Sequence, residues 1–271
     1  MSNARPFYII SHRCNDKNCI IDSLKEGANA FECDLHYGKR KDKWVVNHDG
    51  YFPNLSITLE DWINEAYDNQ NDNLCFLYLD IKSYDYLSSL IQHVHDCANK
   101  HIQSGKKPIK IIYSIARLDN AMVQFKENIS KFDEWEGITV DYNNDPTDVN
   151  TFYKALRNSE KEQGRNFERF FYGNGITAAC PDTEKMRKNL RSACELRDKD
   201  KVIKKTFIWT IEKTDTAKTY LDIGVDAIMT NVVSRNHIDN IYKAIEEHNN
   251  SSENQVRLAT TADDLFTVFT P

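Results

Sequence analysis

Glycine and proline are scarce in this chain of 271 residues, which contains 9 Gly and 6 Pro. That scarcity excludes collagen-like and linker-dominated designs. No apolar run reaches the roughly 18 residues that a transmembrane helix needs, so we expect no membrane-spanning segment. A basic surplus is also absent: 35 Lys and Arg against 41 Asp and Glu leave a formal charge of −6. This balance argues against a nucleic-acid-binding protein, which usually carries a basic domain or stripe.

The cysteines do not form a zinc-binding pattern. None of the seven belongs to a C-x-x-C pair, which argues against a zinc ribbon. Cys33 and Cys75 fall inside apolar runs, and we expect them to be free thiols in the core. Two candidate disulfide pairs lie in polar, loop-like stretches: Cys180 with Cys194, and Cys14 with Cys19. Either pair can close a short loop if the protein is secreted, and Cys180–Cys194 is favoured.

Short apolar runs alternate with helical patterns along the chain. The predicted strands are residues 7–11, 30–34, 44–48, 74–82, 109–114, 137–140, 167–172, 206–211 and 225–230. The predicted helices are residues 19–26, 58–67, 86–101, 119–131, 148–158, 183–198, 214–221 and 236–248. If 44–48 is the second arm of a hairpin with 30–34, eight strand–helix units remain. That number predicts a (β/α)8 TIM barrel.

We expect one domain over residues 1–271, with a tail at 254–271 packed on the barrel. The alternative is a doubly wound open sheet, but no G-x-G-x-x-G follows the first strand as its dinucleotide-binding form requires. Residues 1–4 are expected to be an expression remnant or the mature N-terminus. Thr58 is expected to cap a helix, and Gly27 and Gly224 are expected to end two others.

Charged and histidine side chains gather at the carboxyl ends of the predicted strands, where a barrel places its active site. The set comprises His12, Glu32, Asp34, His48, Asp80 and Lys82. Strand side chains alternate with period 2, so Glu32 and Asp34 are expected to share a face that Cys33 does not. For the same reason, Asp80 and Lys82 are expected to share a face.

Three carboxylates around one point repel one another unless a cation lies between them. Such a donor set suits a hard divalent ion, Mg²⁺ first and Ca²⁺ second. Two histidines can exchange protons beside it, and the target that fits this combination is a phosphodiester. A lone histidine at a strand end is usually structural, and acidic residues there are often helix caps. The occurrence of both kinds at consecutive strand ends nevertheless favours a catalytic site. The remaining histidines are expected to be structural or surface residues: His36, His93, His95, His101, His237 and His248.

At these residues the chain resembles the glycerophosphodiester phosphodiesterase superfamily. The motifs are His12-Arg13, residues 27–34 (GANAFECD) and residues 45–50 (VVNHDG). Within it, the chain is most similar to the sphingomyelinase D/phospholipase D toxins of sicariid spiders and their bacterial and fungal relatives. Further similarities are Arg5-Pro6, residues 207–213 (FIWTIEK), 224–231 (GVDAIMTN) and 257–264 (RLATTADD). The resemblance runs from Arg5 to about Phe266.

This resemblance implies a role for each matching residue. His12 and His48 match the catalytic pair, with His12 as the base and His48 as the acid. Glu32, Asp34 and Asp80 match the Mg²⁺ ligands. In the family the substrate's own hydroxyl attacks phosphorus, which implies release of choline or ethanolamine and formation of a cyclic phosphate.

The resemblance also identifies substrate-binding residues. Lys82 matches a phosphate-contacting lysine, and Trp209 and Asn231 match residues that line the headgroup pocket. An indole face attracts a quaternary ammonium group, although core packing is the alternative for Trp209. The family implies secretion and a phospholipid substrate at a membrane or micelle surface, and we expect a monomer. The membrane-contact candidates are Tyr51, Phe52 and Pro53.

The chain departs from the spider toxins at several positions. Residues 51–55 contain no cysteine, so the toxin-like Cys180 lacks its loop partner, and Cys194 is the preferred partner, as in the bacterial-type enzymes. The tail reads Asp264-Leu265-Phe266 in place of Asn-Pro-Trp. Glu212 and Phe207 replace an Asp and a Tyr of the toxin pocket. These differences indicate a non-spider or divergent member.

Two other functions stay open at this point. One is hydrolysis of soluble glycerophosphodiesters, which differs from the family reaction in its product. The other is a barrel that binds lipid headgroups without catalysis. The pair His12 and His48 argues against the second, because binding alone does not require two titratable histidines around a metal site.

Overall fold

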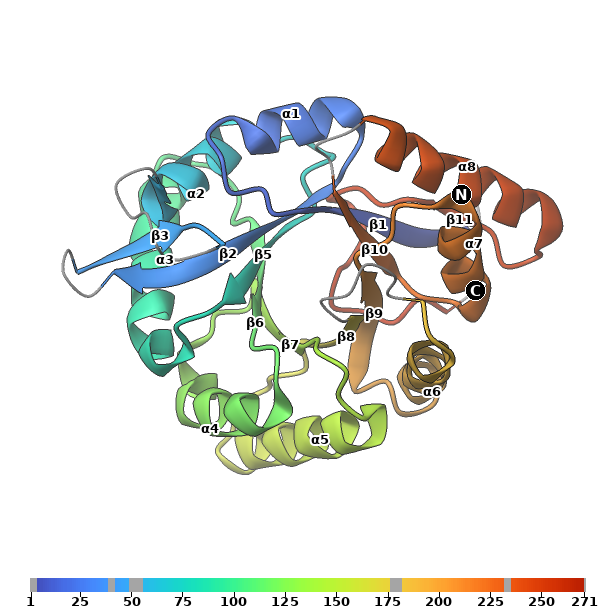
Figure 1. Ribbon diagram of the computed structural model, residues 1–271. Coiled ribbons are helices and arrows are strands. Elements are labelled where there is room, and N and C mark those ends of the chain that lie inside the picture. Colours follow the sequence, from blue (N-terminus) through green and yellow to red (C-terminus); the bar gives the residue numbers. More distant parts are fainter. Residues whose placement is uncertain (1–3, 39–41, 49–55, 176–181, 232–234, 271) are drawn as a thin grey trace.

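The computed structural model is a ring of parallel strands surrounded by helices (Figure 1). It describes residues 4–38, 42–48, 56–175, 182–231 and 235–270. The barrel strands in these ranges are β1 (Arg5–His12), β2 (Ala30–Gly38), β5 (Phe76–Ile81), β6 (Lys110–Ser114), β7 (Glu136–Val140), β8 (Phe170–Gly175), β9 (Ile203–Trp209) and β10 (Ala227–Asn231). Each pairs with its neighbours in parallel, and pairing of β1 with β2 closes the ring. The predicted TIM barrel is therefore confirmed.

A helix follows each barrel strand. The helices are α1 (Cys19–Glu26), α2 (Leu59–Asp68), α3 (Leu87–Gln103), α4 (Leu118–Asn128), α5 (Pro146–Glu162), α6 (Glu184–Asp200), α7 (Thr214–Ile223) and α8 (Arg235–Ser251), with short 3₁₀ turns at Tyr84–Tyr86 and Ile129–Lys131. The predicted end signals act as expected. Thr58 accepts a hydrogen bond from Asp61 N, and Gly27 and Gly224 end α1 and α7 with φ of 101° and 95°. Among the described residues, no helix has the length and apolar character needed to cross a membrane.

The predicted hairpin extends the second barrel strand. β2 pairs in antiparallel fashion with β3 (Lys43–Val46), which in turn pairs with β4 (Ile57–Thr58). The short β4 was not expected from the sequence. Because β3 runs back toward the barrel beside β2, the chain just beyond it brings His48 to the carboxyl end of the barrel strands.

The C-terminal tail closes the interior of the barrel. It begins with β11 (Val256–Leu258), which pairs with the start of β1, and Ala259 N donates to Phe7 O at 2.9 Å. Ala259 and Leu265 are buried in the same apolar cluster as the inward-facing Tyr8 and Phe76. A second, larger cluster lies between the strands and the helices. The tail therefore packs on the barrel, as predicted, and also supplies part of its core.

Two strands are displaced from their predicted positions. β8 begins at Phe170, three residues later than predicted: the Arg169 guanidinium just before it lies 4.4 Å from the Phe167 ring centroid and donates to Glu136 O and Asp133 O. β9 begins at Ile203, three residues earlier than predicted. The reason is that Lys204 and Lys205 are buried within the strand while their ammonium groups donate to backbone carbonyls of Lys201 and Thr267.

A buried ion-pair cluster stabilises the amino-terminal end of the barrel. Asp226 is 2% exposed and lies 2.9 Å from Arg5 Nη1 and 2.7 Å from Arg197 Nη1. It also accepts from Thr206 N at 2.8 Å. Burial alone raises the pKa of this carboxyl, but the two guanidinium groups outweigh it and lower the pKa to about 2.

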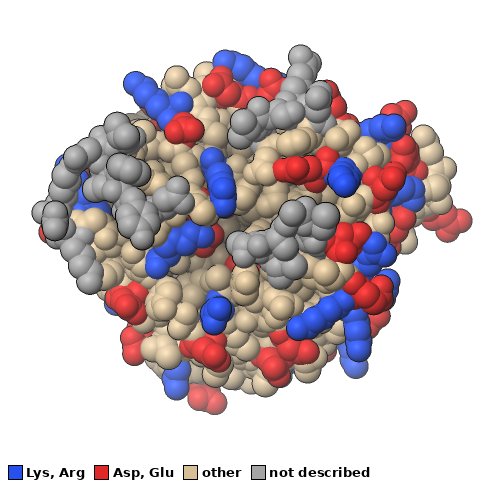
Figure 2. Space-filling model, viewed as in Figure 1, with Lys and Arg blue, Asp and Glu red and all other residues tan. Residues whose placement is uncertain are grey.

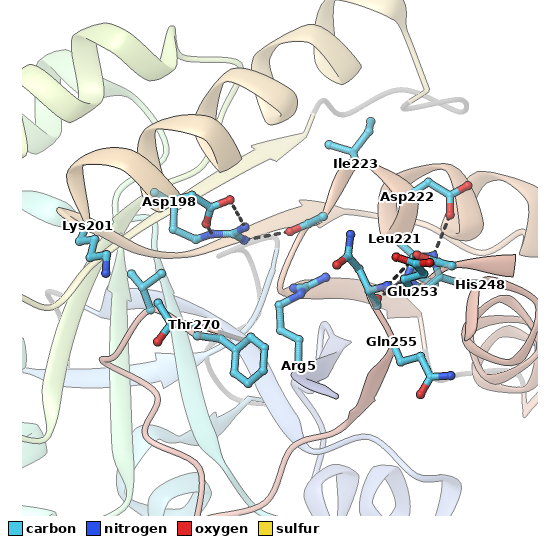
Figure 3. Close-up of a pocket in the computed structure, with 16 residues that line it drawn as sticks. Arg5, Asp198, Lys201, Leu221, Asp222, Ile223, His248, Glu253, Gln255 and Thr270 are labelled. Atoms are coloured by element: carbon cyan, nitrogen blue, oxygen red, sulfur yellow. Dashed lines mark hydrogen bonds and ion pairs between the residues drawn. The ribbon is translucent and has the colours of Figure 1, made fainter. Parts of the chain in front are cut away.

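A cavity of about 550 Å³ adjoins this cluster. The side chains around it include Arg5, Lys201, Gln255 and Thr270, and Asp198 is bonded to the neighbouring guanidinium of Arg197 (Figure 3). Arg5 begins β1, whereas the predicted site residue His12 ends it. The cavity thus lies at the end of the barrel away from the predicted site.

We predict that Asp226→Asn lowers the free energy of unfolding by about 3–5 kcal/mol, because it removes the buried counter-charge of both guanidinium groups and leaves Arg197 only the exposed Asp198. Since the folded pKa is depressed, the contribution of Asp226 is complete above its unfolded pKa of about 3.9. It is lost as pH falls toward the folded value of about 2. Urea unfolding at pH 7 and at pH 3 measures both effects.

The matched control is Asp198→Asn, which also removes a carboxylate from Arg197. Asp198 is 60% exposed, so its loss should cost less than about 1 kcal/mol. Equal destabilisation by the two substitutions would contradict the assignment of Asp226 as the buried anchor.

Candidate active site

Three predicted carboxylates meet at the carboxyl end of the barrel. Glu32 and Asp34 lie on β2 and are 2% and 1% exposed, and Asp80 on β5 stands in register with Asp34. One carboxylate oxygen from each lies within 4.8 Å of the others. Cys33 points the opposite way, into the apolar layer beneath the helices. The alternation predicted from the sequence therefore produces the cluster.

The electrostatics of this cluster are dominated by burial and mutual repulsion. Burial and the charges of Asp34 and Asp80 raise the pKa of Glu32 well above its usual value. Burial, with the neighbouring Asp34, also raises the pKa of Asp80. For Asp34 burial acts in the same direction, but the ammonium group of Lys82 and a hydrogen bond from Asn15 outweigh it and lower the pKa.

Lys82 lies between two of the three acids. Its Nζ is 2.9 Å from Asp34 Oδ1 and also contacts Asp80 Oδ2. Burial lowers the pKa of Lys82, but these two carboxylates more than reverse that effect, so the ammonium stays charged. One ammonium among three carboxylates leaves excess negative charge on oxygen ligands, a donor set that fits a hard divalent cation such as Mg²⁺ or Ca²⁺.

His12 ends β1 beside this cluster and is oriented by a hydrogen-bonded chain. Its Nδ1 lies 2.7 Å from Asn231 Oδ1, and Asn231 Nδ2 donates to Glu212 Oε1. Because the Asn231 amide donates to a carboxylate, its oxygen faces His12 and accepts the Nδ1 proton. Burial lowers the pKa of His12 and so favours the neutral ring. Its Nε2 is then a proton acceptor.

His237, which was expected to be a structural or surface residue, lies beside two members of this hydrogen-bonded chain, Asn231 and Glu212. Its Nδ1 donates to Asn231 O at 3.0 Å, and its Nε2 lies 3.8 Å from Glu212 Oε2. The sequence analysis recognised Glu212 as a pocket position. It did not identify His237 or Asn231 as residues that contact Glu212.

His48 follows β3 and meets the loop after β1. Its Nε2 is 2.6 Å from Arg13 Nη2, and since a guanidinium only donates, this nitrogen acts as an acceptor. The backbone N of Arg13 donates to Glu32 Oε2 at 2.5 Å, which connects the histidine to the carboxylate cluster. His36 Nε2 donates to His48 O at 3.2 Å, so His36 has a structural role, as expected.

Trp209 lies at the end of β9 with its ring 6.3 Å from that of Tyr142. The indole Nε1 donates to Asp141 O at 2.8 Å. A Cβ on Gly175 of the adjacent strand would overlap the indole, so glycine is required there for the ring to lie against β8. Trp209 is only partly buried, so it is not enclosed in the core.

Asp141 was missed in the sequence. It directly follows β7, is 5% exposed and accepts from Tyr78 OH at 2.5 Å. Burial and the nearby Asp80 raise its pKa to about 7. Its position at a strand end was the available signal, but the following polar loop made it resemble an ordinary loop residue.

Several Lys or Arg side chains border the hollow near the middle of the face shown in Figure 2. Lys82 is one basic residue of the site, with its side chain 31% exposed. Basic groups around a hollow attract an anionic group even though the whole chain is acidic. The membrane-contact candidates Tyr51, Phe52 and Pro53 lie outside the described residues.

A second cluster of possible metal ligands lies elsewhere on the barrel. His95, Asp133 and Glu136 also place ligand atoms within 4.8 Å of one another. Glu136, however, already accepts from Tyr113 OH at 2.5 Å, from Asp133 N at 2.7 Å and from His95 Nε2 at 2.8 Å. The hydrogen bond to Glu136 raises the pKa of His95. This network joins α3 to β6 and β7 and fits the structural role expected for His95.

The disulfide differs from the favoured pairing. Cys14 and Cys19 form the bond, with Cα atoms 5.3 Å apart. Cys194 carries a free thiol, so the expected Cys180–Cys194 pairing is wrong: Cys194 faces the barrel wall from α6, with Sγ 3.3 Å from Thr206 Oγ1. Cys180 lies outside the described residues. Cys33 and Cys75 are free and buried, as predicted.

The chain matches a family of known proteins over nearly its whole length. The sphingomyelinase D/phospholipase D family model matches residues 2–266. The chain belongs to this family. A sphingomyelinase D of Arthroderma benhamiae is 22% identical, covering 97% of this chain and 78% of the relative. A dermonecrotic toxin of Loxosceles spinulosa is 24% identical, covering 97% of this chain and all of the toxin.

Solved structures show the same fold. A glycerophosphodiester phosphodiesterase from Parabacteroides distasonis superimposes with a TM-score of 0.56 at 16% identity, covering 89% of this chain and 99% of the other. This likeness shows the shared barrel fold. As a member of the sphingomyelinase D/phospholipase D family, the protein is an enzyme of the phosphodiesterase or phosphorus–oxygen lyase class.

We predict that Gly175→Ala displaces the indole of Trp209, because the added methyl group occupies the same space as the ring. The expected result is altered tryptophan fluorescence with the far-ultraviolet circular dichroism of the barrel unchanged. In a Trp209→Phe background the same substitution should leave the fluorescence of the remaining tryptophans unaltered. A change of equal size in both backgrounds would show that Gly175 acts on another part of the structure.

Proposed function

We propose that this family member cleaves sphingo- or lysophospholipids in the manner of a phospholipase D, releasing choline or ethanolamine and leaving a cyclic phosphate. The observation that carries the proposal is the convergence of three carboxylates with His12 and His48 at one end of the barrel. The family match supports the substrate class, since the curated relatives include a protein named sphingomyelinase D.

The two histidines divide the proton transfers in this proposal. His12 has its Nδ1 proton held by Asn231, so Nε2 can take the proton of the attacking substrate hydroxyl. That oxygen forms a bond to phosphorus, and the bond from phosphorus to the headgroup oxygen breaks. His48 then protonates the departing oxygen, which restores the proton balance of the reaction.

The three carboxylates would hold a divalent ion. Glu32, Asp34 and Asp80 would be its ligands, with Mg²⁺ preferred over Ca²⁺. Bound Mg²⁺ would supply a Lewis acid for the non-bridging phosphate oxygens. Lys82 adds a positive charge from the same face, and the exposed Arg13 can turn from His48 toward a phosphate oxygen.

Trp209 and Asn231 support binding of the headgroup. A partly exposed indole provides a π face for a quaternary ammonium group. Asn231 lies between His12 and Glu212, so headgroup binding and proton transfer involve the same side chain. Glu212 adds a carboxylate to this pocket, where the spider toxins carry the shorter Asp.

We further propose that the protein is secreted and works as a monomeric single domain at a membrane or micelle surface. The similarity to a dermonecrotic toxin supports secretion. The proposal needs no transmembrane segment, since the barrel can meet lipid with the loops around its carboxyl end.

Phosphorus NMR tests the reaction directly. We predict that incubation with lysophosphatidylcholine or sphingomyelin and Mg²⁺ produces a cyclic phosphate signal together with free choline. A monoester that appears without a cyclic precursor would identify a hydrolytic glycerophosphodiesterase instead. Binding of these lipids with no turnover would support a headgroup-binding barrel.

We predict that His12→Ala, His48→Ala and Asp80→Ala each lower the rate by about 10²–10⁴, because each removes a proton-transfer group or a ligand of the metal. The measurement is initial rate of choline release at saturating Mg²⁺. His36→Ala is a control for general loss of a histidine near the site, since the His36 side chain donates to the backbone carbonyl of His48 and not to its imidazole. A near-wild-type rate in any of the three variants would remove that residue from the machinery.

A further inference from the structure

The loop between β1 and α1 contacts two of the three clustered carboxylates. Arg13 N donates to Glu32 Oε2, and Asn15 makes two hydrogen bonds to Asp34. Asn15 Nδ2 donates to Asp34 Oδ2 at 2.8 Å, and Asp34 N donates to Asn15 Oδ1 at 2.9 Å. Asn15 therefore holds Asp34 at two points, once at its carboxylate and once at its main chain.

The loop must hold an unfavourable backbone conformation to make these contacts. Arg13 has a φ of 55°, in the left-handed region that is unfavourable for a residue other than glycine. Asn15 N donates back to Arg13 O at 2.8 Å, which closes a tight turn. Such a conformation persists only where surrounding contacts hold it in place.

The Cys14–Cys19 disulfide is the covalent part of those contacts. It joins the residue between Arg13 and Asn15 to the first residue of α1. Cys14 is also held by Trp62 Nε1, which donates to its carbonyl at 2.8 Å, and by its own N, which donates to Glu32 O at 2.8 Å. Cys14 is fully buried, whereas Cys19 is partly exposed beside the exposed residues 16–18.

We infer that Asn15 is a positioning residue for Asp34, acting from a loop that the Cys14–Cys19 disulfide holds in its ligand-orienting conformation. The inference rests on the proposed function only in taking Glu32, Asp34 and Asp80 as the divalent-cation site. Groups that hydrogen-bond to metal ligands set the orientation of those ligands, and their loss usually weakens metal binding about 10- to 100-fold. Reduction of the disulfide therefore weakens divalent-cation binding.

The reduction step balances with a dithiol as the reductant. The disulfide takes up two electrons and two protons and becomes the thiols of Cys14 and Cys19, while the dithiol is oxidised to a cyclic disulfide. Attack at the partly exposed Cys19 sulfur is the accessible route. The other described cysteines are already free thiols and do not change in this step.

The test is Mg²⁺ titration of the oxidised full chain by isothermal titration calorimetry, with thermal unfolding measured on the same samples. We predict that Asn15→Ala raises the Kd for Mg²⁺ about 10- to 100-fold. Lys17→Ala, which removes an exposed side chain of the same loop, should leave the Kd unchanged. A purely structural Asn15 would lower the melting temperature and leave the Kd as in wild type, and that result overturns the inference.

The disulfide arm uses dithiothreitol and Cys19→Ser, which breaks the bond while keeping the buried Cys14 in place. Both should raise the Kd for Mg²⁺, and dithiothreitol should have no further effect on Cys19→Ser. Unchanged Mg²⁺ binding after complete reduction, verified by thiol counting, overturns the role of the disulfide. The readout of both arms is metal binding and not catalysis. A protein that binds Mg²⁺ but cleaves no phospholipid would therefore disprove the proposed function, while the Mg²⁺ titrations would still decide this inference.

Discussion

Repulsion among three carboxylates is the constraint on which the rest of the site depends. Glu32, Asp34 and Asp80 lie within 4.8 Å of one another, and two of them are almost fully buried. Left to themselves these groups would move apart or take up protons. They stay together because the parallel register of β2 and β5 places Asp34 opposite Asp80, so separation would require breaking the barrel wall. Lys82 and the donors of the β1–α1 loop offset part of the repulsion.

The two ends of the barrel use the same chemical group in opposite ways. Asp226 lies between two guanidinium groups, and its pKa falls to about 2. Glu32 lies between other acids, and its pKa rises. Barrels commonly keep stabilising groups at the amino-terminal face and catalytic groups at the carboxyl face. Here the difference is electrostatic: one cluster is complete within the protein, whereas the other still lacks positive charge.

Much of this arrangement was readable from the sequence because it depends on short-range rules. Period-2 alternation was sufficient to place Glu32 and Asp34 together, and the number of strand–helix units was sufficient for the barrel. Where these rules failed, the cause was tertiary. The start of β9 was hidden by Lys204 and Lys205, which are buried in the strand while their ammonium groups donate to the carbonyls of the nearby Lys201 and the distant Thr267.

Partners that meet only in the folded chain were harder to find. Nothing in the spacing of Cys14 and Cys19 distinguished them from Cys180 and Cys194, because disulfide pairing depends on where the thiols point. The favoured pair failed since the Cys194 thiol faces β9. Asn15 went unnoticed for a related reason: it lies in a loop three positions after His12, and its partner Asp34 is 19 residues away in the sequence.

The hydrogen bonds of the histidines set an order of events for the proposed chemistry. His12 presents Nε2 as an acceptor whether or not substrate is present, because Asn231 holds the proton on Nδ1. His48 also has an acceptor nitrogen, but Arg13 donates to it. A proton cannot occupy that nitrogen while the guanidinium does, so Arg13 must leave before His48 can act as an acid. In the proposed reaction an arriving phosphate would draw Arg13 away, and the acid would then be available only when there is a headgroup to protonate.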